Sequence, residues 1–421
     1  MKGEKMTSGS SCGDPFHIRA IDRHFFGSIP VIALLIGLVM LAEAGAVGSR
    51  DPATGRIKVL YIGEPNGQSP YPMLESDPLM MPYPVVASTV VYSIDIAKRS
   101  IRLYMPRNYD GLSSYQVIIL SDANAAIFTP NHLSWIRDAV DVEGSGLVMI
   151  GGYEAFGGMA GHADWGPTAV GEALPVECLP GQWTGGKVEI LEPEHPFVAS
   201  LPIEPNLEWR RLYDGNMVEV REGALELART VDRDINPFWV TWEFGAGRSF
   251  AISGDWTPGG GVVFMRWEYY GDFANNLMLY MSRNELPEDL QTVHMARTRF
   301  HEYKFSKAYL FAVMEFGEKF GANMDPVVEI IDDADTGFKE ATRAYLDLDY
   351  EGSLGLLDEA MQVLVDGNER AFQLKDQAML WIYLIEWSVV TSTFAICGVV
   401  VWTLMVRRRY YREMGSTRFA A

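Results

Sequence analysis

The strongest constraint on this chain is an uncharged run of 20 residues near its C-terminus, Trp387–Val406 (WSVVTSTFAICGVVVWTLMV). As a helix, such a run spans about 30 Å, the thickness of the hydrocarbon core of a bilayer. Arg407, Arg408 and Arg409 follow at once, and basic residues mark the cytoplasmic side of a span. We therefore predict a transmembrane helix at 381–406 and a basic cytoplasmic tail at 407–421. A buried core helix is the alternative.

A second apolar run, Phe25–Ala42, follows Arg19 and Arg23 and precedes the small residues Ala44-Gly45-Ala46. This pattern is typical of a secretory signal peptide, and the run is also long enough for an uncleaved signal anchor. Both interpretations stay open for residues 1–48, which we expect to form a cytoplasmic leader followed by one or the other. In either case the residues between the two runs lie outside the cytoplasm, on a protein of the cell membrane with one or two anchors.

Charge and cysteine content exclude several classes of protein. The chain has 55 Asp and Glu against 35 Lys and Arg, a net charge of −20, which disfavours nucleic-acid binding. Its three cysteines show no CxxC spacing, and only Cys178 lies between the two apolar runs. We expect no disulfide framework, no metal and no cofactor.

Alternating strands and a helix predict the fold class. Apolar runs at 56–63, 115–120 and 146–150 are typical of buried strands, and Thr129-Pro130 starts a helix between the last two. This order predicts an α/β domain with a parallel sheet over residues 50–286. We expect a loop to about residue 83, a helix near 85–92 and a strand at 100–104. Short strands, partly antiparallel, should follow over 187–253, with a closing helix at 272–282.

Residues 287–380 form a different, membrane-proximal region. Apolar residues recur there every three or four positions, which predicts two or three amphipathic helices leading into the span. The helices at 293–378 could pair with other membrane subunits and make the chain a scaffold, or they could form a self-contained hairpin. The lipid bilayer is the partner that the sequence itself predicts.

Several segments together carry a family resemblance. They are YQVIILSD at 115–122, GSGLVMIGGYEAFGG at 144–158, WEFGAGRSFAISGD at 242–255 and DFANNLMLYM at 272–281. In this order, the stretch from Lys58 to Met281 resembles the class I glutamine amidotransferase-like domains, in particular membrane-attached members and relatives of the trehalose-utilisation type. The resemblance implies a flavodoxin-like parallel sheet with an added β segment.

The resemblance also implies where an active member carries its nucleophile. A cysteine sits in a G-x-C-x-G turn after a strand, at the start of a helix, and a His and an acid complete a triad. In this chain Gly151 or Gly152 occupies that place. We therefore expect a pseudoenzyme that serves ligand binding or assembly at the cell surface.

A relocated catalytic group is the alternative, a hydrolase or amidotransferase built around Glu154, Cys178 and His195. Cys178 would need His195 or His162 as its base, oriented by Glu154 or Asp164. Otherwise Cys178 is a small apolar residue of the core.

Polar residues follow three of the predicted strands. Glu64, Asp122 and Glu154 should converge at one sheet edge, where they could exchange protons, hold a cation or cap helices. The amides of Gly151-Gly152 could bind an anion, or these glycines could only permit a tight turn. With Tyr153, these residues form the predicted ligand site.

The remaining candidates have weaker patterns. His162, Asp164 and His195 match no metal signature. Tyr153 and Trp165 could stack on a ligand or pack inside the loop. Four tryptophans, at 239, 242, 256 and 267, could bind carbohydrate, although their spacing favours the core.

Overall fold

The computed structural model describes residues 50–66, 68–159, 164–203 and 211–416, all of which belong to one compact unit, Gly48–Ala421. The first apolar run and His162 lie outside the described residues.

A single nine-stranded sheet forms the centre of the α/β part, in the order β2-β1-β3-β4-β9-β8-β7-β5-β6. The first five strands of this order run parallel, and the other four continue the sheet antiparallel. The α/β prediction with an added β segment is confirmed. The strands are β1 (Ile57–Gly63), β2 (Met80–Val86), β3 (Val117–Ser121), β4 (Gly146–Ile150), β5 (Val176–Ile190), β6 (Arg211–Val220), β7 (Leu225–Asp232), β8 (Asn236–Phe244) and β9 (Gly247–Ile252).

Helices cover both faces of the sheet, because alternate residues of each buried strand point to opposite sides. Val59 and Tyr61 of β1 enter one apolar cluster, and Leu60 and Ile62 enter the other. The first cluster packs against α2 (Tyr71–Ser76), α7 (Pro196–Ala199), α8 (Pro258–Met265) and α9 (Tyr270–Met281). The second packs against α3 (Ile94–Tyr104), α4 (Tyr109–Ser113), α5 (Pro130–Asp141) and α6 (Ala169–Ala173), with a short 3₁₀ helix at Ala125–Ile127.

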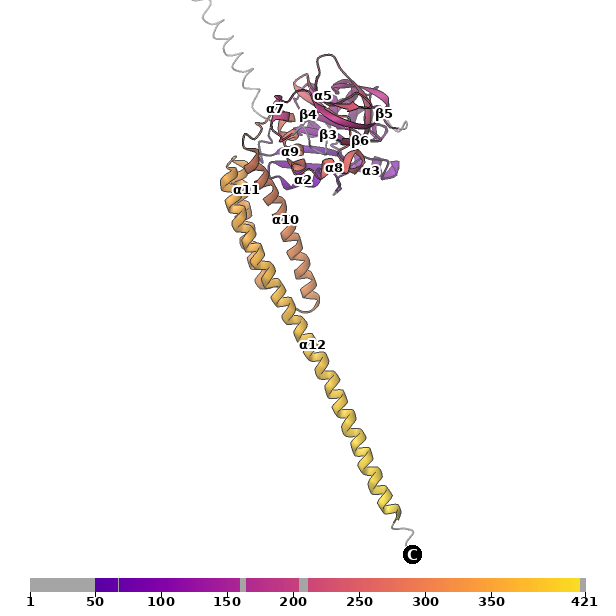
Figure 1. Cartoon of the computed structure of the whole chain (residues 1–421), viewed down its shortest axis with the longest axis vertical. Helices are drawn as coiled ribbons and strands as arrows, with labels where there is room; N and C mark the ends of the chain where they lie inside the picture. The colour runs from indigo at the N-terminus through magenta and orange to yellow at the C-terminus, as the bar shows by residue number, and fades with distance from the viewer. Residues whose placement is uncertain (1–49, 67, 160–163, 204–210, 417–421) are drawn as a thin grey trace, which may run out of the picture. The chain divides into compact units, whose positions relative to one another are not determined.

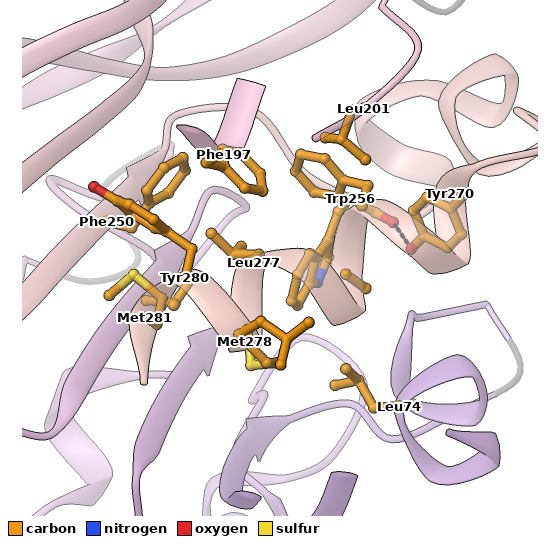
Figure 2. Packing of buried hydrophobic residues seen from close by; sticks show 14 of the residues in the cluster. Leu74, Phe197, Leu201, Phe250, Trp256, Tyr270, Leu277, Met278, Tyr280 and Met281 are labelled. Atoms are coloured by element: carbon orange, nitrogen blue, oxygen red, sulfur yellow. Dashed lines mark hydrogen bonds between the residues drawn. The ribbon is translucent and has the colours of Figure 1, made fainter. Parts of the chain in front are cut away.

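Helix α9 is the most enclosed of these helices, since eleven of its twelve residues are buried. Figure 2 shows Leu277 and Met278 of α9 among aromatic side chains from α7 and β9, and the Tyr270 hydroxyl donating to the Trp256 carbonyl at 2.7 Å. The helix that was predicted to close the domain is therefore a central part of the core.

The tryptophans divide by burial. Trp239 and Trp256 are fully buried and belong to the core, as their spacing favoured. Trp242 and Trp267 are half-buried.

Three long helices follow, α10 (Leu290–Lys319), α11 (Asp325–Leu346) and α12 (Tyr350–Ser416). They pack along one another around their own apolar cluster, which includes Leu310, Val327 and Leu364 (Figure 1). Phe300 and Tyr345 of these helices also belong to the core under the sheet. The helical region is thus joined to the α/β part by a shared core.

Among the described residues one helix, α12, is long and apolar enough to cross a membrane. None of its most apolar window is buried inside the structure, so the alternative of a core helix is wrong. The same helix continues without a break from the packed region through the apolar run, and Figure 1 shows it passing the end of α10.

The segment from 64 to 104 differs from the prediction. The expected loop contains α2 and strand β2, and Pro82 and Pro84 are tolerated because β2 is an edge strand. The helix expected near 85–92 and the strand at 100–104 are also wrong, since the helix is α3, starting at Ile94. A short apolar run does not separate one helical turn from a strand.

Candidate functional site at the carboxyl edge of the sheet

Four neighbouring parallel strands, β1, β3, β4 and β9, end at the same edge of the sheet. Acidic residues follow each of them: Glu64, Asp122, Glu154 and Asp255. The sequence analysis missed Asp255, although Ser253-Gly254-Asp255 after β9 resembles Ser121-Asp122 at the end of β3. The edge is where ligands bind in open α/β sheets.

Asp122 lies at the centre of this edge. Its backbone is left-handed, with φ of 51°, and its Oδ1 accepts a hydrogen bond from the Glu154 amide at 2.6 Å. Burial, with smaller contributions from the charges of Asp255, Glu154 and Glu64, raises the pKa of Asp122 to about 7, against the hydrogen bond from the Glu154 amide that lowers it. This carboxyl is therefore able to gain or lose a proton near neutral pH.

Asp255 and Glu64 flank it. Burial raises the pKa of Asp255 to about 6, against hydrogen bonds from Thr257 that lower it. The pKa of the half-buried Glu64 is also raised by desolvation, and its Oε2 accepts from Asn66 at 3.2 Å. Glu64, Asp122 and Asp255 form what we call the edge carboxylates.

Glu154, by contrast, is wholly buried and serves the protein itself. Its Oε2 accepts from the Thr89 amide at 2.5 Å, and its Oε1 accepts from the Thr89 hydroxyl and from Asn124 Nδ2, the latter at 2.6 Å. Thr89 follows β2 and Asn124 follows β3, so Glu154 fastens three strand-end loops together. Both carboxylate oxygens of Glu154, which belongs to the predicted ligand site, therefore already accept hydrogen bonds from the protein.

The glycine turn after β4 is closed against its neighbours. A Cβ on Gly151 would lie 2.4 Å from the Ser253 carbonyl oxygen, and one on Gly152 would lie 2.5 Å from Asp122 Oδ1. The Gly152 amide donates to Asn216 Oδ1 at 2.9 Å and the Gly151 amide to the Ile252 carbonyl at 2.8 Å. These amides serve the turn, so of the two interpretations the tight turn is favoured over the anion site.

The aromatic residues of this region have different surroundings. Tyr153 is exposed, whereas Trp165 is fully buried and donates from Nε1 to the carbonyls of Ala123 and Glu154. Trp165 is therefore a packing residue, whereas Tyr153 reaches solvent.

The proposed catalytic pair does not come together. Cys178, on β5, packs against the cluster on one face of the sheet. His195 precedes α7, with its Nε2 3.3 Å from the Tyr280 hydroxyl on the other face. Burial, with a smaller contribution from Asp164, raises the pKa of the Cys178 thiol to about 12, and burial lowers the pKa of His195.

Metal ligands do not gather in the part of the chain that the structure describes, where no three His, Cys, Asp or Glu side chains could hold an ion. Asp164 Oδ1 instead accepts from the Gly166 amide at 2.9 Å.

The fold and this edge define a class, an α/β domain with a mixed sheet and acidic residues after its parallel strands. Residues 89–283 match the family model described as "Putative glutamine amidotransferase". The chain carries a glutamine amidotransferase-like domain.

Two solved structures from Salmonella typhimurium, both described as cytoplasmic proteins, are similar to it at 24% and 23% identity. Each covers 53% of this chain and 99% of its own length, with a TM-score of 0.44. No curated protein matches the chain.

Proposed function

We propose that this chain is a membrane-anchored pseudoenzyme whose amidotransferase-like domain lies outside the cytoplasm and serves ligand binding or assembly at the cell surface. The observation that carries the proposal is the closed glycine turn after β4. Any side chain at Gly151 or Gly152 would meet the Ser253 carbonyl or Asp122 below van der Waals distance. The turn therefore has no room for a nucleophile.

The thiol and imidazole chemistry supports the same proposal. A catalytic cysteine needs a lowered pKa and a base within hydrogen-bond reach. Cys178 has a raised pKa, and His195 packs on the opposite face of the sheet. A hydrolase built from Glu154, Cys178 and His195 would require these groups to meet.

The membrane placement rests on α12. Its apolar window is unburied, and Arg407, Arg408 and Arg409 follow the apolar run. By the bias of basic residues toward the cytoplasm, the residues between the two apolar runs would lie on the other side.

Ammonia release from glutamine by the purified full chain tests the loss of catalysis. We expect no release above the buffer rate, and no difference between the wild type and Cys178→Ala. Cys397→Ala is the matched control, because Cys397 is exposed on α12 away from the domain. Release that Cys178→Ala abolishes and Cys397→Ala retains would overturn the proposal.

A scaffold role is a second candidate, favoured by one surface of α10. Phe305, Tyr309 and Phe316 lie four and seven residues apart, and all three are exposed. Such spacing places them on one side of the helix, where a partner helix could cover them. Crosslinking from Tyr309 in native membranes tests this role, and recovery of uncrosslinked monomer alone would contradict it.

A further inference from the structure

A large apolar surface is exposed on the α/β part, on the segment after β2 and on α3. All of residues 90–96 are exposed, and most of them are large and apolar. Folded domains rarely expose such a run away from an interaction site. The six most exposed apolar residues of this surface, which we call the α3 patch, are Val90, Val91, Ile94, Ile96, Leu103 and Tyr104.

The backbone under the α3 patch is held in place. Just before the patch, the Thr89 amide donates a hydrogen bond to Glu154 Oε2 at 2.5 Å. On the inner side of α3, Ile101 is buried in the second apolar cluster. Ile96 and Leu103 are two helical turns apart, so they project together from the exposed side of the helix. The patch is therefore a fixed surface that a partner can recognise.

Basic residues surround the patch. Lys98, Arg99 and Arg102 are exposed on α3, and in the part of the chain that the structure describes none of them forms an ion pair. Residues 94–107 carry four basic side chains against one acidic one, although the whole chain has a net charge of −20. A partner that complements both features is acidic and has apolar side chains of its own.

The chain itself exposes such a surface on α11. Residues 325–340 carry six acidic side chains against one basic one. Four of the acidic residues, which we call the acidic face, are exposed and form no ion pair among the described residues: Glu329, Asp332, Asp333 and Glu340. Glu329 lies three and four residues before the two aspartates, and Glu340 lies seven residues after Asp333, so all four share one side of the helix. Val328, which is 45% exposed, adds an apolar side chain at the border of this face.

The α3 patch and the acidic face belong to opposite faces of the sheet. Helix α3 packs against the second apolar cluster, whereas α11 joins the first through Ala341 and Tyr345. The sheet therefore separates the two surfaces within one chain, and the acidic face that can reach the patch is that of a second copy. A contact between two different surfaces is head-to-tail, so it joins copies into rows unless it closes into a ring.

The proposed membrane anchor favours a protein partner over the bilayer. Leu357 of α12 packs in the core under the sheet, and the helix between Leu357 and Trp387 is about 45 Å long. The α/β part is thus held away from the bilayer that α12 would enter. Anchoring in one membrane also raises the effective concentration of neighbouring copies.

We propose that the α3 patch binds the acidic face of α11 on a second copy of this chain. Arg99 and Arg102 pair with acidic side chains of the neighbouring α11, which also covers the apolar residues of the patch. The contact rests on the assembly role proposed above and names its partner. It uses none of the edge carboxylates.

Sedimentation velocity of the full chain in detergent, over a range of protein concentrations, tests this contact. We expect the wild type to pass from monomer to species larger than a dimer as its concentration rises, and about 0.5 M salt to suppress them, because salt screens exposed charges. Arg99→Glu/Arg102→Glu should weaken association at least tenfold. Lys187→Glu/Arg233→Glu is the matched control, because it changes the net charge equally at exposed residues on β5 and just after β7.

A second variant tests the head-to-tail geometry. Glu329→Gln/Asp332→Asn keeps the α3 patch but removes two charges from the acidic face, so it should also weaken association at least tenfold. Mixed with Arg99→Glu/Arg102→Glu, whose acidic face is intact, it should form dimers that do not grow. All four positions are exposed, so both variants should melt at the temperature of the wild type.

A wild type that is monomeric at every concentration, association unchanged in either variant, or a mixture that stays monomeric would overturn the proposal and leave the loss of catalysis untouched. Ammonia release from glutamine would overturn the pseudoenzyme without changing association. An anionic lipid surface is the other occupant that a basic, apolar patch fits. Binding of the nanodisc-held wild type, but not of Arg99→Glu/Arg102→Glu, to phosphatidylserine vesicles without association of copies would also overturn the proposal.

Discussion

At the scale of single residues, Asp122 is a carboxyl at the sheet edge whose ionisation the fold opposes. Its folded pKa of about 7 lies above the roughly 3.9 of a free aspartate, because burial and neighbouring carboxylates oppose its ionisation. A carboxyl with a raised folded pKa stabilises the fold fully below its unfolded pKa, and that contribution is lost as the pH rises through the folded value. Asp122 therefore contributes least to the stability of the fold in alkaline solution.

Asp122→Asn tests this charge directly. Asn keeps the acceptor for the Glu154 amide and tolerates the left-handed backbone, but it cannot ionise. We expect the variant to be more stable than the wild type by about 1–3 kcal/mol at pH 8 and equal to it near pH 4. Thermal melting in detergent at the two pH values measures this, and a difference independent of pH would contradict it.

At the scale of elements, α10 is fastened to the domain by one buried arginine. Arg297 bonds to Asp77 before β2, to Asp272 on α9 and to Tyr345 on α11. Removing it would leave the buried Asp77 without a counter-charge and Asp272 with His294 alone, which costs far more than the ion pairs themselves contribute.

We expect Arg297→Met to lower the free energy of unfolding by about 3–5 kcal/mol. Arg299→Met is the matched control two residues away, because its ion pairs with Glu302 and Asp358 are solvent-exposed and its effect should stay within about 0.5 kcal/mol. Equal losses of thermal stability in the two variants would show that the ion pairs of Arg297 do not stabilise the fold.

Elements also differ in how far the sequence predicts them. β1, β3 and β4 are continuous apolar runs, and α5 has a Thr129 cap and a first-turn proline, so local signals suffice for them. β2 could not be found this way, because Pro82 and Pro84 are acceptable only at a sheet edge, which is a property of the whole fold. Asp255 joins the edge carboxylates for the same reason, since its place depends on β9 pairing with β4.

At the scale of the whole molecule, the account predicts opposite sides of the membrane for α10 and the end of α12. In a variant without native cysteines, Glu318→Cys should react with a membrane-impermeant maleimide on intact cells, and Arg412→Cys should not. Both side chains are exposed, so neither is shielded by the protein. Labelling at position 412 but not at 318 would reverse the orientation.

The central claim is that this amidotransferase-like domain has lost its nucleophile, and the reactivity of Cys178 tests it most directly. In the folded full chain with Cys12 and Cys397 replaced by serine, Cys178 is the one thiol left for iodoacetamide at neutral pH. With its pKa raised to about 12, we expect slow labelling in the native state and complete labelling after unfolding. Native labelling faster than that of a free cysteine would reveal an activated thiolate and contradict the account.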